Sequence, residues 1–335
     1  MQILCDGITN FNSVQTKAPI RNDNYFLPLA KFRFYNPRMS INRRTFLEVS
    51  GAAALAGRVQ VTDKSSVKIE KDIVFAKAAQ TDLRCDIYRP PAGTEKRMGL
   101  IHIHGGGFAR GTKDNMGDQI IPITSRGYVS IAVEYRLSSV AKWPAPIQDV
   151  KAAIRWMRAN ASSLRIDPQR IAVVGHSAGG HLALFAAGTA NRPEFEGESG
   201  TPKAGTELAA CVAFYPVTVI NPQSFAAALM PDGSDEAANR AASPTSYVTK
   251  TFAPTILIHG LADVTVAPES SQRFLQLLRD AGVASELHTF AGVPHEFDQH
   301  PEFAESCAQL IDFFLDRHVL HPRTYPPFQP GAPRR

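Results

Sequence analysis

The chain has 335 residues, 44% of them hydrophobic and 20% charged, which is enough apolar content for one large folded core or two small ones. The formal net charge of +5 lies entirely in residues 1–66, which hold 9 basic and 4 acidic side chains, so the remainder is neutral and lacks the basic surface typical of nucleic-acid-binding proteins. No uninterrupted run of about 18 apolar residues is present, and we therefore predict no integral membrane segment.

Residues 1–66 are predicted to be a basic leader outside the folded core. Within it, Arg43 and Arg44 precede Phe46-Leu47 and a short apolar stretch, so residues 39–57 resemble a twin-arginine export signal. Met39 is then the expected start, and residues 1–38 a miscalled extension. Two locations stay open: export to the periplasm or the extracellular space, or a cytoplasmic protein with an unstructured leader.

Strands and helices alternate along the rest of the chain. Alternating or continuous apolar runs predict strands at 67–75, 83–88, 100–103, 128–134, 170–174, 208–214, 255–259 and 285–290. Helical periodicity predicts helices at 147–159, 181–187, 269–281 and 301–319.

This alternation predicts an α/β fold with a mostly parallel, twisted sheet of about eight strands and helices on both faces. The first two strands are expected to form an antiparallel pair. One catalytic domain is assigned to residues 67–320, and its long irregular segment 217–252 is expected to be a small cap-like insertion. A proline-rich tail, residues 321–335, is expected to lie outside the core.

The segment Gly175-His176-Ser177-Ala178-Gly179 lies between the strand at 170–174 and the helix at 181–187. A G-x-S-x-G sequence at a sharp strand-to-helix turn is typical of the nucleophile elbow of α/β-hydrolases, which makes Ser177 the candidate nucleophile. The strand before it and the helix after it make this signal much more specific than the five-residue pattern alone.

Further candidate residues follow other strands. A glycine run, residues 104–108, follows the strand at 100–103, Asp263 follows the strand at 255–259, and His295 follows the strand at 285–290. The order Ser177, Asp263, His295 is that of α/β-hydrolase triads, and parallel sheets place such residues together at the carboxyl ends of their strands. Asp298 is a less favoured alternative acid, because it does not directly follow a strand.

The remaining histidines and the cysteines suggest no metal site, and no cofactor is predicted. His104 and His176 are expected to be structural hydrogen-bonding residues, and His102 and His259 to lie in the core or behind the site. The cysteines are expected to be buried free thiols, at Cys5, Cys85, Cys211 and Cys307.

Residues 67–319 resemble the α/β-hydrolase esterases. The runs His104-Gly105-Gly106-Gly107 and Ser177-Ala178-Gly179-Gly180 are shared with the hormone-sensitive-lipase-like branch. The residue before Ser177 and the sequence His259-Gly260-Leu261-Ala262-Asp263 are closer to the feruloyl/acetylxylan-esterase-like (BD-FAE-like) carbohydrate esterases. Three further segments also resemble that second branch more closely: Asp86-Ile87-Tyr88-Arg89-Pro90, Val133-Glu134-Tyr135-Arg136-Leu137 and Ser243-Pro244.

The resemblance implies a serine esterase that hydrolyses short-chain carboxylic esters, with acetyl or feruloyl esters on carbohydrate as the expected small-molecule or polysaccharide substrates. It also implies an oxyanion hole formed by the N–H groups of Gly105, Gly106 and Ala178. An amide or formamide hydrolase, a lipase-like small-ester hydrolase and a non-catalytic ligand-binding protein remain alternatives on the same scaffold.

Pocket residues are less well defined. Phe108, Arg110 and Tyr135 are the candidate lining residues. Glu296 stands where many relatives have glycine, directly after the candidate catalytic histidine, and the sequence offers no account of this difference.

Overall fold

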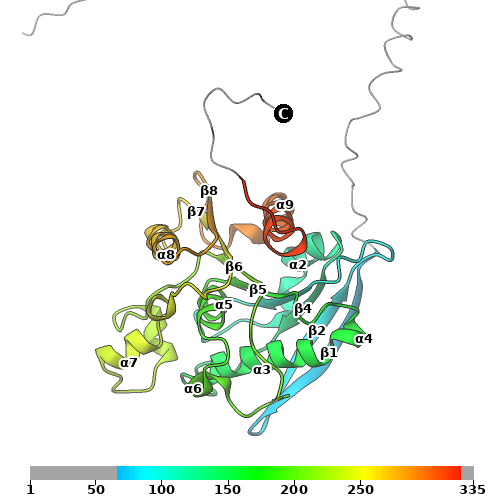
Figure 1. Ribbon diagram of the computed structural model, residues 1–335. Coiled ribbons are helices and arrows are strands. Elements are labelled where there is room, and N and C mark those ends of the chain that lie inside the picture. Colours follow the sequence, from blue (N-terminus) through cyan, green and yellow to red (C-terminus); the bar gives the residue numbers. More distant parts are fainter. Residues whose placement is uncertain (1–65, 202, 326–335) are drawn as a thin grey trace, which may run out of the picture. The chain divides into compact units, whose positions relative to one another are not determined.

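The computed structural model describes residues 66–201 and 203–325 (Figure 1). Residues 1–65 of the predicted leader, with the twin-arginine-like segment and Cys5, and residues 326–335 of the predicted tail lie outside the described residues and stay predictions. Within the described ranges, no helix has the length and apolar content needed to cross a membrane.

An eight-stranded sheet forms the centre of the described part, in the order β1-β2-β4-β3-β5-β6-β7-β8. The strands are β1 (Lys68–Ala78), β2 (Thr81–Arg89), β3 (Gly99–Ile103), β4 (Val129–Val133), β5 (Ile171–His176), β6 (Ala210–Phe214), β7 (Thr255–Gly260) and β8 (Ser285–Phe290). Strand β2 is antiparallel to both β1 and β4, and every other pair of neighbours is parallel. The prediction of a mostly parallel sheet with the α/β-hydrolase fold is confirmed.

The helices of the described residues differ widely in length. The α-helices are α2 (Gly117–Thr124), α3 (Ala145–Ala159), α4 (Ala161–Leu164), α5 (Ala178–Gly188), α6 (Pro193–Glu196), α7 (Glu236–Ala241), α8 (Glu269–Asp280) and α9 (Pro301–Leu315). The 3-10 helices are η3 (Lys113–Met116), η4 (Phe225–Leu229), η5 (Pro244–Tyr247) and η6 (Phe297–Gln299), and a π-helical turn, η7 (Asp316–Leu320), follows α9.

Helices cover both faces of the sheet, because successive residues of each buried strand point in opposite directions. Ile101 of β3 and Val173 of β5 belong to the apolar cluster that includes buried residues of α3, α5 and α8. Their neighbours Leu100 and Ala172 belong to the cluster on the other face, with α2 and α9 (Figure 1). The central strands are therefore buried on both sides, as their apolar sequences predict; these are β3, β4, β5, β6 and β7.

Three differences from the sequence-based expectations concern α2, the C-terminal helix and the long segment at 217–252. Helix α2 was not expected, and it contains Pro122, a residue that removes one backbone donor from a helix. The helix expected to run to residue 319 ends as α9 at Leu315 and continues as η7. The segment 217–252, expected to be irregular, contains η4, α7 and η5.

The register of the sheet determines which loops meet. Ile103 at the end of β3 pairs with Gly175 of β5, and Gly260 at the end of β7 pairs with Phe290 at the end of β8. The glycine run therefore emerges beside the turn that holds Ser177, and the loops that hold Asp263 and His295 emerge beside each other.

Candidate active site

Ser177 occupies the turn between β5 and α5 in a conformation that L-residues rarely adopt, with φ of 55° and ψ of −113°. The turn is held by the Ser177 N–H, which donates to the Phe214 carbonyl at 3.0 Å, and by the Ser177 carbonyl, which accepts from the His181 N–H at 3.0 Å. Such strained conformations persist where the surrounding structure fixes them, and they are common at functional sites.

Ser177, His295 and Asp263 form one hydrogen-bonded chain. The Ser177 Oγ donates to Nε2 of His295 at 3.0 Å, and Nδ1 of His295 donates to Oδ2 of Asp263 at 2.6 Å. The other carboxylate oxygen of Asp263, Oδ1, accepts from the backbone N–H groups of Thr265 at 2.8 Å and Val266 at 2.9 Å. The carboxylate is therefore fixed at both oxygens, and the structure brings together the three residues that the sequence proposed.

His259 supports the acid from behind. Its Nε2 lies 2.9 Å from the Val266 carbonyl and 3.2 Å from Oδ2 of Asp263, and its Nδ1 lies 2.8 Å from the Ser271 hydroxyl. Burial lowers the pKa of His259 despite the nearby carboxylate. A neutral ring protonated at Nε2 satisfies these contacts, as expected for a residue behind the site.

The glycine run packs against the nucleophile turn. A Cβ on Gly105 would lie 3.0 Å from the His176 carbonyl oxygen and 3.2 Å from Cβ of Ser177, so only glycine allows this approach. The N–H groups of Gly105 and Gly106 donate to no other described residue. Ala178 is the first residue of α5, where a backbone N–H has no partner within the helix.

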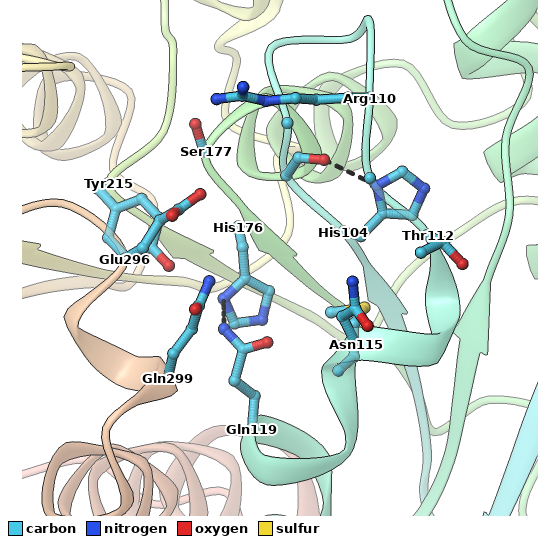
Figure 2. A pocket seen from close by; sticks show the side chains of 14 residues that line it. His104, Arg110, Thr112, Asn115, Gln119, His176, Ser177, Tyr215, Glu296 and Gln299 are labelled. Atoms are coloured by element: carbon cyan, nitrogen blue, oxygen red, sulfur yellow. Dashed lines mark hydrogen bonds between the residues drawn. The ribbon is translucent and has the colours of Figure 1, made fainter.

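His104 shapes this turn, as expected. Its Nδ1 lies 2.8 Å from the Gly105 carbonyl, and its ring stacks on Tyr135 at 4.4 Å (Figure 2). Burial lowers its pKa to about 4, so the imidazole is neutral at physiological pH and donates from Nδ1.

A cavity of about 320 Å³ opens beside Ser177. Figure 2 shows polar side chains around it, with Arg110 on one side and Glu296 and Gln299 on another. It is lined by His104, Gly105, Gly106, Arg110, Gly111, Thr112, Asn115, Met116, Gln119, His176, Ser177, Tyr215, Glu296 and Gln299. Arg110 and Glu296 have no ion-pair partner among the described residues, so both charges are available to a bound molecule.

Phe108 and Tyr135, which were expected to line the pocket, are not among these lining residues. Phe108 is fully buried, with its ring 5.3 Å from that of His181, and the Tyr135 hydroxyl donates to the His104 carbonyl at 3.2 Å. Both side chains support the glycine run from the core instead. Arg110 does line the cavity.

No motif in the sequence marks four of the polar lining residues, Thr112, Asn115, Gln119 and Gln299. Their positions in the sequence could have indicated this role. They follow the glycine run and His295 closely, and the sheet register brings these two loops to the same cavity.

Glu296 has a backbone explanation that the sequence did not reveal. Its φ of 59° and ψ of 23° lie in the left-handed region, which glycine adopts without steric penalty. Glycine would fit this local conformation better, and the chain instead places an exposed carboxylate in the cavity wall.

Asp298 does not contact the imidazole nitrogens of His295. Its carboxylate instead accepts from Nδ1 of His176 and from Nε2 of Gln119, each at 2.8 Å. The geometry therefore favours Asp263 over Asp298 as the partner of His295.

Among the described residues, no three or more His, Cys, Asp or Glu side chains are grouped so that they could hold a metal ion. Cys85, Cys211 and Cys307 are free and buried, as predicted. Burial, together with the adjacent Asp86, raises the pKa of the Cys85 thiol to about 12.

Comparison with known proteins gives a consistent result. The BD-FAE family model matches residues 85–278, which is more than half of the chain. Esterase LipQ of Mycobacterium tuberculosis is 33% identical over 247 residues, a match that covers 68% of this chain and 57% of LipQ. The matches to the M. tuberculosis proteins LipM and LipC each cover 48% of the length of those proteins. The chain therefore spans about half the length of these curated relatives.

Solved structures show the same fold. A truncated carbohydrate esterase from gut microbiota has a TM-score of 0.68 and 25% identity, covering 77% of this chain and 98% of that one. Esterase 2 of Thermogutta terrifontis, with butyrate bound, has a TM-score of 0.66 and 26% identity, covering 78% and 98%. The same esterase has also been solved phosphoramylated by tabun.

Proposed function

The chain belongs to the BD-FAE family, and on that premise we propose that it is a serine esterase that hydrolyses short-chain carboxylic esters. Ser177 is the proposed nucleophile, His295 the general base and acid, and Asp263 the residue that orients His295. The hydrogen-bonded chain from Ser177 through His295 to Asp263, at the wall of an open polar cavity, is the observation that carries this proposal.

In the first step, Nε2 of His295 accepts the Ser177 proton while Oγ attacks the ester carbonyl carbon. The 3.0 Å separation of Oγ and Nε2 is within the range for this proton transfer. Asp263 holds the proton on Nδ1 and stabilises the imidazolium that forms.

The developing oxyanion is stabilised by the backbone N–H groups of Gly105, Gly106 and Ala178. These donors are supplied by two rigid elements, the glycine run and the first turn of α5, so no reorganisation is needed as charge develops. Loss of one such donor typically raises the barrier by about 3–4 kcal/mol.

Collapse of the tetrahedral intermediate breaks the bond to the alcohol oxygen, which takes the proton from Nε2 of His295. Water then attacks the acyl-enzyme, with His295 accepting the water proton and returning a proton to Ser177. The products are a carboxylic acid and an alcohol.

Acetyl or feruloyl esters on carbohydrate are the proposed natural substrates. Arg110, Asn115, Glu296 and Gln299 supply hydrogen-bonding groups of the kind that bind hydroxylated alcohols. The cavity volume of about 320 Å³ favours the small acetyl group over the larger feruloyl group. One similar structure is a carbohydrate esterase, and another holds butyrate, which supports both parts of the proposal.

The test is a set of initial rates for wild type and Ser177→Ala on p-nitrophenyl acetate through decanoate, acetylated xylan and methyl ferulate. We expect turnover of the short esters and at least one carbohydrate-derived ester, with a loss of about 10⁶-fold in kcat for the variant. Equal inertness of both proteins on every ester would contradict the proposal.

A further inference from the structure

A second hydrogen-bonded network lies behind the Ser177–His295–Asp263 chain and is centred on Asp298, which is 1% exposed. Its Oδ2 accepts from Nδ1 of His176 at 2.8 Å and from Nε2 of Gln119 at 2.8 Å, and its Oδ1 accepts from the Tyr215 hydroxyl. Burial alone would raise the pKa of Asp298, but these donors, with His176 the largest, hold it below its usual value. The side chain is therefore a buried, satisfied carboxylate.

Tyr215 connects this network to the proposed base. Its ring centroid lies 4.4 Å from that of His295, with the planes inclined at 57°, and its side chain is 1% exposed. The Tyr215 backbone has a φ of 34°, a region that L-residues rarely adopt, so the surrounding contacts define the position of this ring.

The network joins four elements that carry the site. His176 ends β5 directly before Ser177, Tyr215 follows β6, Gln119 lies on α2, and Asp298 lies in η6, in the same loop as His295. The stacking of His176 on Phe214, at 4.6 Å, adds a further link between β5 and β6. The turn that carries the nucleophile and the loop that carries the base are thus held to one buried carboxylate.

We propose that Asp298 and Tyr215 are positioning residues that fix the ring plane of His295, so that Nε2 stays aligned with Ser177 Oγ when the imidazole gains and loses its proton. The Asp263 bond restrains His295 at Nδ1, and the Tyr215 ring restrains one face of the imidazole. Asp298 fixes Tyr215 by accepting from its hydroxyl. This inference rests on the proposed function, because alignment of the base matters only if His295 is catalytic.

The chain provides a matched control elsewhere. Tyr128 is also fully buried, and its hydroxyl donates to Oδ1 of Asp312 at 2.7 Å, in the apolar cluster that contains α9. Tyr215→Phe and Tyr128→Phe therefore each remove one buried hydroxyl from a Tyr–Asp hydrogen bond. They differ in that only the first hydroxyl lies in the network that contacts His295.

The experiment compares kcat, KM and Tm for both phenylalanine variants on p-nitrophenyl acetate. We expect a similar loss of Tm in the two variants, and a loss of kcat on the order of 10-fold with nearly unchanged KM in Tyr215→Phe alone, because small errors in alignment reduce rates strongly. Wild-type kcat in Tyr215→Phe, or an equal loss in Tyr128→Phe, would overturn the proposal.

Asp298→Asn gives a second readout that a purely structural role would not change. The titratable groups packed near His295 are Asp263, His259 and the Tyr215–Asp298 pair, and Glu296 follows it in sequence; Asn removes one negative charge from this set. We therefore expect the acidic limb of the kcat/KM profile to move to lower pH, since a carboxylate favours the imidazolium. Asp312→Asn is the control, and the same shift in both variants would count against the proposal.

The two proposals fail in different ways. An inert wild type, or a Ser177→Ala variant as active as wild type, would reject the esterase mechanism. An active wild type with an inactive Ser177→Ala and a fully active Tyr215→Phe would reject only the positioning role.

Discussion

At the scale of single residues, Glu296 combines an unfavourable backbone conformation with a place in the cavity wall. Its φ of 59° is left-handed, which for an L-residue costs about 1–2 kcal/mol relative to ordinary conformations. The residue also follows His295 directly, so its carboxylate is the nearest acidic group in sequence to the proposed base. Backbone and charge effects can be separated by two substitutions.

Glu296→Gly should increase the free energy of unfolding by about 1 kcal/mol, which raises Tm by a few degrees, because glycine adopts this conformation without steric penalty. Glu296→Ala removes the same carboxylate but keeps the strain, and it should leave Tm close to that of wild type. Thermal unfolding followed by circular dichroism measures both. An equal Tm increase in the two variants would assign the effect to charge and not to the backbone.

At the scale of elements, the contact between α5 and the glycine run determines the site geometry. A Cβ on Gly179, in the first turn of α5, would lie 2.1 Å from the Ile103 carbonyl oxygen and 2.5 Å from that of His104. These are backbone atoms of β3 and of the glycine run, so they cannot move aside as a flexible side chain would. The N-terminus of α5 must shift if a methyl group is added.

Gly179→Ala is therefore expected to reduce kcat by about 100-fold or more, since a displacement near 1 Å is enough for a loss of this size. Gly117→Ala is the matched control, because Gly117 begins α2 in a helical conformation and a Cβ there would meet nothing within 4 Å. It should leave kcat unchanged and increase stability by about 0.5 kcal/mol. Initial rates and urea unfolding curves measure both effects, and wild-type rates in Gly179→Ala would show that the turn tolerates the displacement.

At the scale of the whole molecule, buried neutral histidines make stability depend on pH. Burial lowers the pKa of His104 and of His181 to about 4 each, and it lowers the pKa of His102 well below the ordinary 6.5. As pH falls below about 6.5, the unfolded chain binds protons at these positions and the folded chain does not. The free energy of unfolding should therefore fall between about pH 6.5 and pH 4, and its contribution from these histidines should level off only where the folded-state imidazoles also bind protons.

His102→Leu tests the origin of this slope. Both ring nitrogens of His102 are buried and have no hydrogen-bond partner, so leucine loses no such bond. The variant should reduce the slope of the free energy of unfolding against pH by up to about 1.4 kcal/mol per pH unit, the value for one proton. His300→Gln, at an exposed imidazole, is the control and should keep the wild-type slope. Urea midpoints across this pH window provide the measurement, and an unchanged slope in His102→Leu would contradict the assignment.

The strands and most of the longer helices could be predicted because they depend on the pattern of apolar residues within each segment. Apolar runs such as 100–103 and 255–259 predicted buried strands, and β3 and β7 include them with boundaries that differ by a residue. Helix α2 escaped prediction because Pro122 and its short length obscure the pattern. The three candidate site residues were predictable because each lies in the loop that follows a strand, and parallel strands present their carboxyl ends at one edge.

What the sequence determined by itself is the α/β fold, the order Ser177, Asp263, His295, and the family to which the chain belongs. Only the tertiary structure decided which residues surround that site. Phe108 and Tyr135 lie in the core, whereas Glu296 and Gln299 line the cavity. Asp298 accepts a hydrogen bond from the Tyr215 hydroxyl. The reason is physical: strand and turn preferences depend on neighbouring residues, whereas the direction of a loop side chain depends on packing between elements far apart in sequence.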